Sequence, residues 1–103
     1  MDIIPINGAE FAADSVAYTG TAGTTDAVWA GPAAGGPKGV LVWTTTDAHV
    51  RVGSGVTATT ADTPIPAYVP FTFMVPANAL TFVVSAIQVS SGGTLYAKPV
   101  GGV

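Results

Sequence analysis

Apolar residues in this chain occur in short runs that are separated by glycine, proline and asparagine. No window keeps the period of about 3.6 residues that marks an amphipathic helix, and the runs are rich in residues that favour strands. The pattern therefore predicts an all-β chain. The strands that we expect are Asp2–Ile6, Ser15–Thr19, Asp26–Ala30, Lys38–Thr45, Ala48–Gly53, Ala67–Val75, Thr81–Val89 and Thr94–Lys98.

The segments between these strands are rich in residues that interrupt secondary structure. Glycine supplies positive φ angles, and proline cannot donate a hydrogen bond to a strand ladder. About eight short strands with turns at this spacing predict an antiparallel β-sandwich of the jelly-roll or Greek-key type, with a small barrel as the alternative. A chain of 103 residues has room for one domain. We assign residues 1–12 to an N-terminal arm or edge strand and residues 13–103 to a single β-sandwich domain.

Two of the strands differ in how many apolar faces they have. Phe71, Phe73 and Val75 lie on one face of their strand and Thr72 and Met74 on the other, which indicates one core face. The strand Thr81–Val89 is apolar on both faces, and such a strand is covered on both faces. In so small a domain we expect the second cover to be another subunit.

The stretch TTTDAHVRVGSG, which begins at Thr44, is expected to form a hairpin with Thr46 and Asp47 at its turn. In that register Trp43 lies opposite Val50. The core face then consists of Leu41, Trp43, Val50 and Val52. His49 and Arg51 project from the other face, beside Val40 and Val42, where contact with another subunit is expected. The full set of predicted interface residues is His49, Arg51, Val40, Val42, Val83, Ile87 and Val89.

The same stretch also contains an acid, the chain's one histidine and a serine, a combination that can support catalysis. A histidine base needs an orienting carboxylate and a nucleophile within hydrogen-bond reach. The hairpin uses Asp47 as a turn residue, whose side chain accepts backbone N–H groups, and so separates it from His49. Ser54 lacks the strand, sharp turn and helix of a nucleophile elbow. We therefore expect no catalytic residue and no enzyme activity.

Metal and cofactor sites are not expected either. The aspartates are spread singly with one imidazole in the whole chain, although a calcium ion held between loops stays an open alternative. The glycine-rich segment Gly31–Pro37 lacks the Lys-Ser/Thr of a phosphate-binding loop. No cysteine is present, which excludes disulfides and thiolate ligands.

Charge limits the possible partners. Only 9% of the residues are charged and mean hydropathy is +0.52, so part of the surface is expected to be covered by other subunits. A net charge of -3 argues against binding to nucleic acid. The uncharged run from Thr63 to Ala97 contains four prolines and many polar residues, so we expect no membrane helix there. The sequence MDIIPINGAEF lacks the basic and apolar regions of an export signal.

Aromatic residues leave one alternative to assembly. Trp29 and Tyr96, if they are exposed on a β-sandwich, would form a platform for stacking sugars. Carbohydrate binding or host adhesion is therefore the alternative function, although cores and subunit interfaces use the same residues.

A family resemblance is carried by a succession of motifs over the last two thirds of the chain. These are VWTTTDAHVRVG, ATTAD followed by PIPA, VPAN, and GTLYAK. The succession resembles small structural proteins encoded among the head genes of tailed double-stranded DNA bacteriophages. Such families often have a glycine after the proline of VPxN, where this chain has Ala77, which leaves the turn type there open.

The resemblance implies a virion component of the decoration or cement type, made in the host cytoplasm. Its expected partners are itself, as a dimer or trimer, and a major capsid protein. A tail or fibre-base location is the alternative. The family has no catalytic residues to transfer, so the expected action is burial of apolar β surface between subunits. In that setting the N-terminal segment is expected to pair with the sheet edge of a neighbour.

Overall fold

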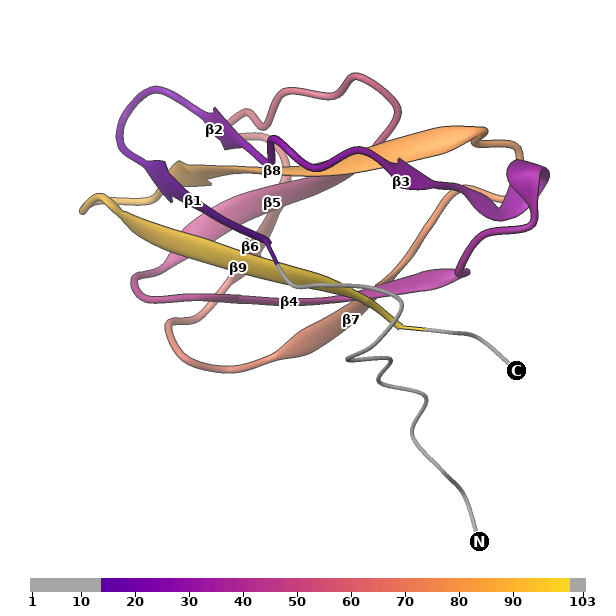
Figure 1. Cartoon of the computed structure of the whole chain (residues 1–103). Coiled ribbons are helices and arrows are strands. Elements are labelled where there is room, and N and C mark those ends of the chain that lie inside the picture. Colours follow the sequence, from indigo (N-terminus) through magenta and orange to yellow (C-terminus); the bar gives the residue numbers. More distant parts are fainter. Residues whose placement is uncertain (1–13, 101–103) are drawn as a thin grey trace, which may run out of the picture.

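The computed structural model describes residues 14–100, which form an all-β sandwich of two antiparallel sheets (Figure 1). A single 3-10 turn, η1 (Pro32–Ala34), is the one helical element of this range. The strands are β1 (Asp14–Tyr18), β2 (Gly23–Thr24), β3 (Trp29–Ala30), β4 (Gly39–Thr44), β5 (Ala48–Gly53), β6 (Thr63–Ile65), β7 (Phe71–Met74), β8 (Thr81–Gln88) and β9 (Gly93–Val100). The predicted fold class is confirmed, and the expected strand Asp2–Ile6 lies outside the described residues.

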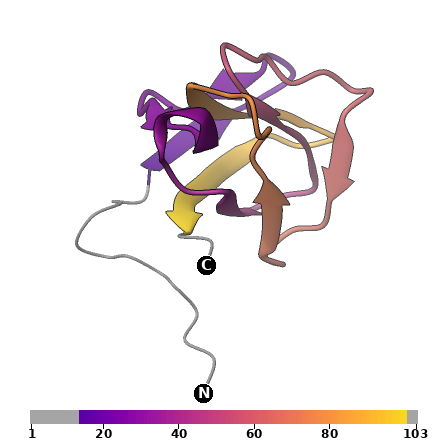
Figure 2. The ribbon, with the colours of Figure 1, turned by 90° about the vertical axis from the view of Figure 1, so that its right-hand side faces the viewer.

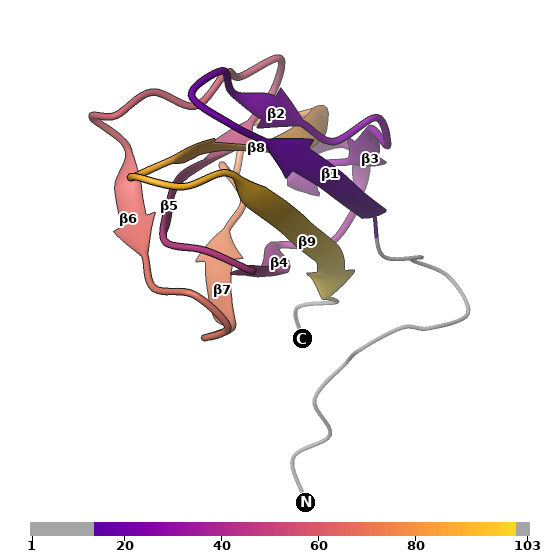
Figure 3. The same ribbon diagram turned by 90° about the vertical axis from the view of Figure 1, so that its left-hand side faces the viewer.

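Sheet A has the strand order β1-β9-β4-β7, and sheet B has the order β2-β8-β5-β6, with β3 also pairing with β8. Figures 2 and 3 show the two layers from opposite sides. Most paired strands are far apart in the sequence, as in β1 with β9 and β5 with β8. The long-range pairing means that neither sheet can form before distant parts of the chain meet.

The predicted hairpin between β4 and β5 is wrong. β4 pairs with β7 and β9 in sheet A, whereas β5 pairs with β6 and β8 in sheet B. The segment Thr45–Asp47 therefore crosses from one sheet to the other. Tyr18 fixes this crossing, because its hydroxyl lies 2.9 Å from the carbonyl oxygen of Thr46 and 2.7 Å from the Thr46 hydroxyl.

The core lies between the sheets, and its side chains alternate along each strand as the pleat requires. Val40 and Val42 of β4 are fully buried and pack with Leu95 and Ala97 of β9. From sheet B the largest contribution is Phe82, which is also fully buried. The core cluster consists of Tyr18, Val40, Val42, Ala48, Val50, Ile65, Val75, Ala79, Phe82, Val84, Ala86, Leu95 and Ala97.

Because β4 does not form the predicted hairpin, its core face and its outer face are the reverse of those predicted. Once β4 is in sheet A, Val40 and Val42 point into the core, while Leu41 and Trp43 point out and are only partly buried. The assignment of Val50 to the core is confirmed. In β7, Val75 beyond its end is buried and Phe73 packs against the core, but Phe71 is 41% exposed because β7 is the last strand of its sheet.

Candidate interaction surfaces

His49 and Arg51 lie on the outer face of sheet B, as predicted for β5, but both hold a loop of their own chain. The Nδ1 of His49 lies 3.0 Å from the carbonyl oxygen of Asp62, and because a carbonyl only accepts, Nδ1 is the donor. The Nε of Arg51 lies 3.7 Å from Oδ1 of Asp62, and the Arg51 side chain is 51% exposed. Because the pair is exposed to solvent, it contributes little to the stability of the fold.

The loop of residues 54–62, which we call the covering loop, lies over the outer face of sheet B and arches above β8 in Figure 1. Its centre is attached through the backbone N–H of Ala58, which donates to the buried hydroxyl of Ser85 over 2.9 Å. Its end is closed by Asp62, whose Oδ2 accepts the N–H of Thr59 over 2.7 Å. The second cover of β8 therefore comes in part from the chain's own loop, which corrects the expectation that another subunit supplies it.

Besides His49 and Arg51, five residues were predicted to lie in an interface, and they differ in burial. Val40 and Val42 are 0% exposed inside the core, so their assignment to an interface is wrong; the reason is that β4 belongs to the other sheet. Val83 is 7% exposed on the covered face of β8. Ile87 is partly buried, and Val89, at 51% exposed just beyond β8, stays accessible to a partner.

The residues weighed for catalysis are not brought together. Oδ1 of Asp47 accepts the backbone N–H of Ala67 over 2.9 Å, while His49 bonds to Asp62. Asp47 therefore does serve as a backbone acceptor, although its partner is twenty residues away. Ser54 lies at the opposite end of β5, where it lines an open hollow with Arg51, Asn78 and others. Within residues 14–100 no group of three metal-ligating side chains occurs, and no helix is long and apolar enough to cross a membrane.

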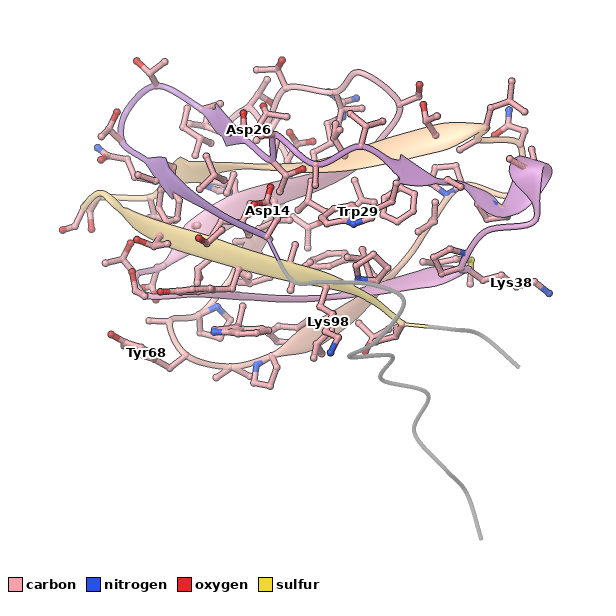
Figure 4. The ribbon with its side chains drawn as sticks, viewed as in Figure 1. Asp14, Asp26, Trp29, Lys38, Tyr68 and Lys98 are labelled. Atoms are coloured by element: carbon pink, nitrogen blue, oxygen red, sulfur yellow. The ribbon has the colours of Figure 1, made fainter. Side chains whose placement is uncertain are left out.

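The outer face of sheet A carries a row of large side chains, two of which, Leu41 and Trp43, were predicted to lie in the core. Trp43 and Tyr96 are paired across β4 and β9, and their rings stack with centroids 5.3 Å apart and an interplanar angle of 11°. Leu41 lies beside them, opposite Lys98. Figure 4 shows Lys98 projecting from the lower sheet, away from the upper one, and Tyr68 on the same side of the molecule, in the turn before β7. We call Leu41, Trp43, Tyr96 and Lys98 the outer face of sheet A.

Trp29, the other residue of the predicted sugar platform, lies between the sheets in Figure 4. Its ring packs on Phe82 with centroids 5.5 Å apart, so Trp29 and Tyr96 do not share a surface. The prediction that Trp43 lies in the core is wrong, since Trp43 stacks on Tyr96 at the outer face. Its strand, GVLVWT, is apolar at every position from Val40 to Trp43, so alternation alone does not reveal which face is buried.

No protein-family model, curated protein or solved structure matches the chain.

Proposed function

We propose that this protein is a virion structural component of the decoration or cement type, which self-associates and binds a capsid shell through the outer face of sheet A. The observation that supports the proposal is the contrast between the two outer faces. Sheet B is covered by its own loop, held at Ser85 and Asp62. Among residues 14–100, the segment that passes below β4 in Figure 1 is residues 66–70, which bonds to Thr44 and leads into β7. No loop of this range arches over the outer face of β9 as the covering loop does over β8.

The composition of this face suits a protein partner. Interface centres are enriched in aromatic residues and depleted in charge, and this face has a stacked Trp43–Tyr96 pair with a single cation, Lys98, beside it. Each square ångström of apolar surface that such a contact buries contributes about 25 cal/mol before association costs are subtracted. On a shell the contact is repeated many times, so a modest affinity per copy is sufficient.

The same aromatic pair favours a second candidate, a carbohydrate-binding or host-adhesion module. A sugar stacks on the flat face of a ring. Trp43 and Tyr96 instead stack on each other, which leaves each with one covered ring face. Sugar binding is therefore the second choice. A titration of Trp fluorescence with bacterial surface oligosaccharides tests it, and saturable quenching that Trp43→Ala abolishes would move it to first place.

The virion proposal is tested by quantitative mass spectrometry of purified particles from the phage that encodes the chain. We expect the chain in those particles at a copy number comparable with that of the major capsid protein. A chain that is abundant in the infected lysate but absent from purified particles contradicts the proposal.

The proposed contact face is tested by adding purified protein to shells that lack it and measuring co-sedimentation. Trp43→Ala is expected to weaken binding at least about tenfold, as truncation of an aromatic anchor does. Leu80→Ala is the matched control, since Leu80 is 66% exposed and lies away from sheet A. Circular dichroism verifies that both variants fold. Equal binding by the two variants would exclude this face as the contact.

A further inference from the structure

Exposed apolar side chains gather along one edge of the sandwich. Of the seven large hydrophobic residues that are exposed in residues 14–100, four lie between positions 68 and 74. They are Tyr68 at 71%, Val69 at 42%, Phe71 at 41% and Met74 at 86% exposed. This segment comprises β7 and the turn before it, and we call it the β7 edge. Its concentration of apolar surface marks an interaction site.

The backbone of β7 has hydrogen-bonding groups along that edge that find no partner within residues 14–100. Among residues 14–100, β7 is the last strand of sheet A and pairs only with β4. The N–H of Val75 donates to Lys38, and because paired residues alternate along an antiparallel ladder, Phe73 and Phe71 also bond inward to β4. The N–H and C=O groups of Thr72 and Met74 therefore point away from the sheet.

Two other sheet edges on the described chain, β6 and β1, carry protecting features that the β7 edge lacks. β6, the edge strand of sheet B on the same side, has Pro64 at its centre, where no N–H is available. Figure 2 shows β6 and β7 as separate strands, which belong to different sheets. At the other edge of sheet A, the carboxylate of Asp14 accepts the N–H of Ala27 from the segment that folds back over β1. Natural proteins protect edge strands with charge or proline, and β7 contains neither.

We propose that β7 is the site at which two copies of this chain dimerise, by pairing antiparallel across a twofold axis at Phe73. In this register Thr72 of each copy lies opposite Met74 of the other, so their free backbone groups form the ladder. The two sheets A then become one continuous eight-stranded sheet. The inference rests on the proposed function in one respect, since it specifies how the copies associate.

The occupant is a second copy for reasons of charge and symmetry. The chain carries a net charge of -3, so two copies repel over most of their surface. The run from Thr63 to Ala97 has no charged residue, so two β7 edges meet without that repulsion. The outward-pointing residues lie symmetrically about Phe73, as an isologous contact requires. Because each copy has one β7, the contact closes as a dimer and does not propagate.

The area of the edge sets the strength of the contact. At ordinary side-chain sizes the exposed parts of the four side chains amount to roughly 450 Å² per copy, hence roughly 900 Å² per pair, below the standard size of about 1,600 Å². We therefore expect a weak dimer that dissociates on dilution. On a shell, attachment of both copies would strengthen it.

Sedimentation velocity of the full chain over a concentration series tests the dimer. The wild type is expected to shift from monomer to dimer as concentration rises. Thr72→Lys combined with Met74→Lys places like charges opposite one another and is expected to raise the dissociation constant at least about tenfold. The matched control is Val28→Lys combined with Leu80→Lys, at exposed positions away from β7, and it should dimerise as the wild type does. A monomeric wild type, or equal loss in both double variants, overturns the inference.

Cysteine cross-linking tests the register, because the chain has no cysteine of its own. In the proposed pairing the Cα atoms of residue 72 and residue 74 of the other copy lie about 5.5 Å apart, within disulfide reach. Residues 72 of the two copies lie about 8 Å apart, beyond that reach. A mixture of Thr72→Cys and Met74→Cys proteins should therefore cross-link far more than either protein alone. Equal cross-linking in all three samples contradicts the register.

Other occupants of the edge give different results. If the N-terminal segment of a neighbour binds there, Ile4→Glu abolishes association while the mixed cysteine pair fails to cross-link. If a foreign strand binds there, the purified chain stays monomeric. Failure of the dimer leaves the particle and shell-binding measurements untouched, so loss of this inference is distinguishable from loss of the proposed function.

Discussion

Ser85 is the point at which three parts of sheet B are held together. Its side chain is fully buried on the outer face of β8. The hydroxyl accepts the N–H of Ala58 over 2.9 Å and the hydroxyl of Thr24 over 3.0 Å, and it donates to the carbonyl of Gly23 over 3.1 Å. One side chain therefore attaches both the covering loop and β2 to the central strand of the sheet.

Ser85→Ala removes these bonds while changing the volume very little. Ala58 is 3% exposed, so its N–H loses its partner in a buried position, which costs about 1–3 kcal/mol. The carbonyl of Gly23 also loses its donor, whereas the hydroxyl of Thr24 is partly exposed and turns to water. We expect the free energy of unfolding to fall by about 2–3 kcal/mol. In a domain of this size that corresponds to a fall in Tm of roughly 10–20 °C.

Urea denaturation and amide hydrogen exchange measure the two parts of this effect. Denaturation gives the loss of stability, and exchange should show that the amide of Ala58 loses its protection while those of β4 keep most of theirs. Ser54→Ala is the control, since Ser54 is an exposed serine at the start of the same loop. If Ser85→Ala costs no more than Ser54→Ala, or if Ala58 stays protected, the covering loop is not held at Ser85 and the contrast between the two outer faces loses its basis.

Three further substitutions test the crossing and the core face of β4. Tyr18→Phe removes the bonds to Thr46 at the sheet-to-sheet crossing and should lower the free energy of unfolding by about 1–2 kcal/mol in urea denaturation. Val42→Ala should cost about 2–3 kcal/mol in the same assay, against less than about 0.5 kcal/mol for Val89→Ala; equal costs would mean that β4 does not bury this face. Thr44→Val should be neutral or stabilising by thermal denaturation, because the buried Thr44 hydroxyl has no hydrogen-bond partner among residues 14–100, and a large loss would reveal one.

The positions of the longer strands could be predicted, because their apolar pattern extends over several neighbouring residues. β5 begins and ends where the pattern predicted, and β8 differs from its prediction by one residue at its end. The short strands β2 and β6 were missed, because two or three residues carry no period, and they exist only through their pairing with β8 and β5. The expected strand Asp26–Ala30 shrinks to β3 for the same reason, since only its last two residues find a partner.

The candidate interaction residues were predicted less well, and β4 explains why. Val40 and Val42 alternate with Leu41 and Trp43, so both faces of the strand are apolar. The predicted hairpin would have buried Trp43. In the structure the chain crosses between sheets after β4, and Val42 is buried instead. Because side chains alternate with a period of two, the choice of partner strand decides which residues of a strand face the core and which face outward.

The sequence by itself determined that the chain is all-β, that its strands lie between glycine- and proline-rich turns, and that too few charges are present to surround every face. These properties depend on local conformational preference and composition. Tertiary structure alone decided that residues 45–47 cross between the sheets, that the covering loop lies over sheet B, and that no strand of residues 14–100 pairs with the outer edge of β7. Each of these depends on which distant strand supplies the hydrogen bonds, and no local pattern specifies that partner.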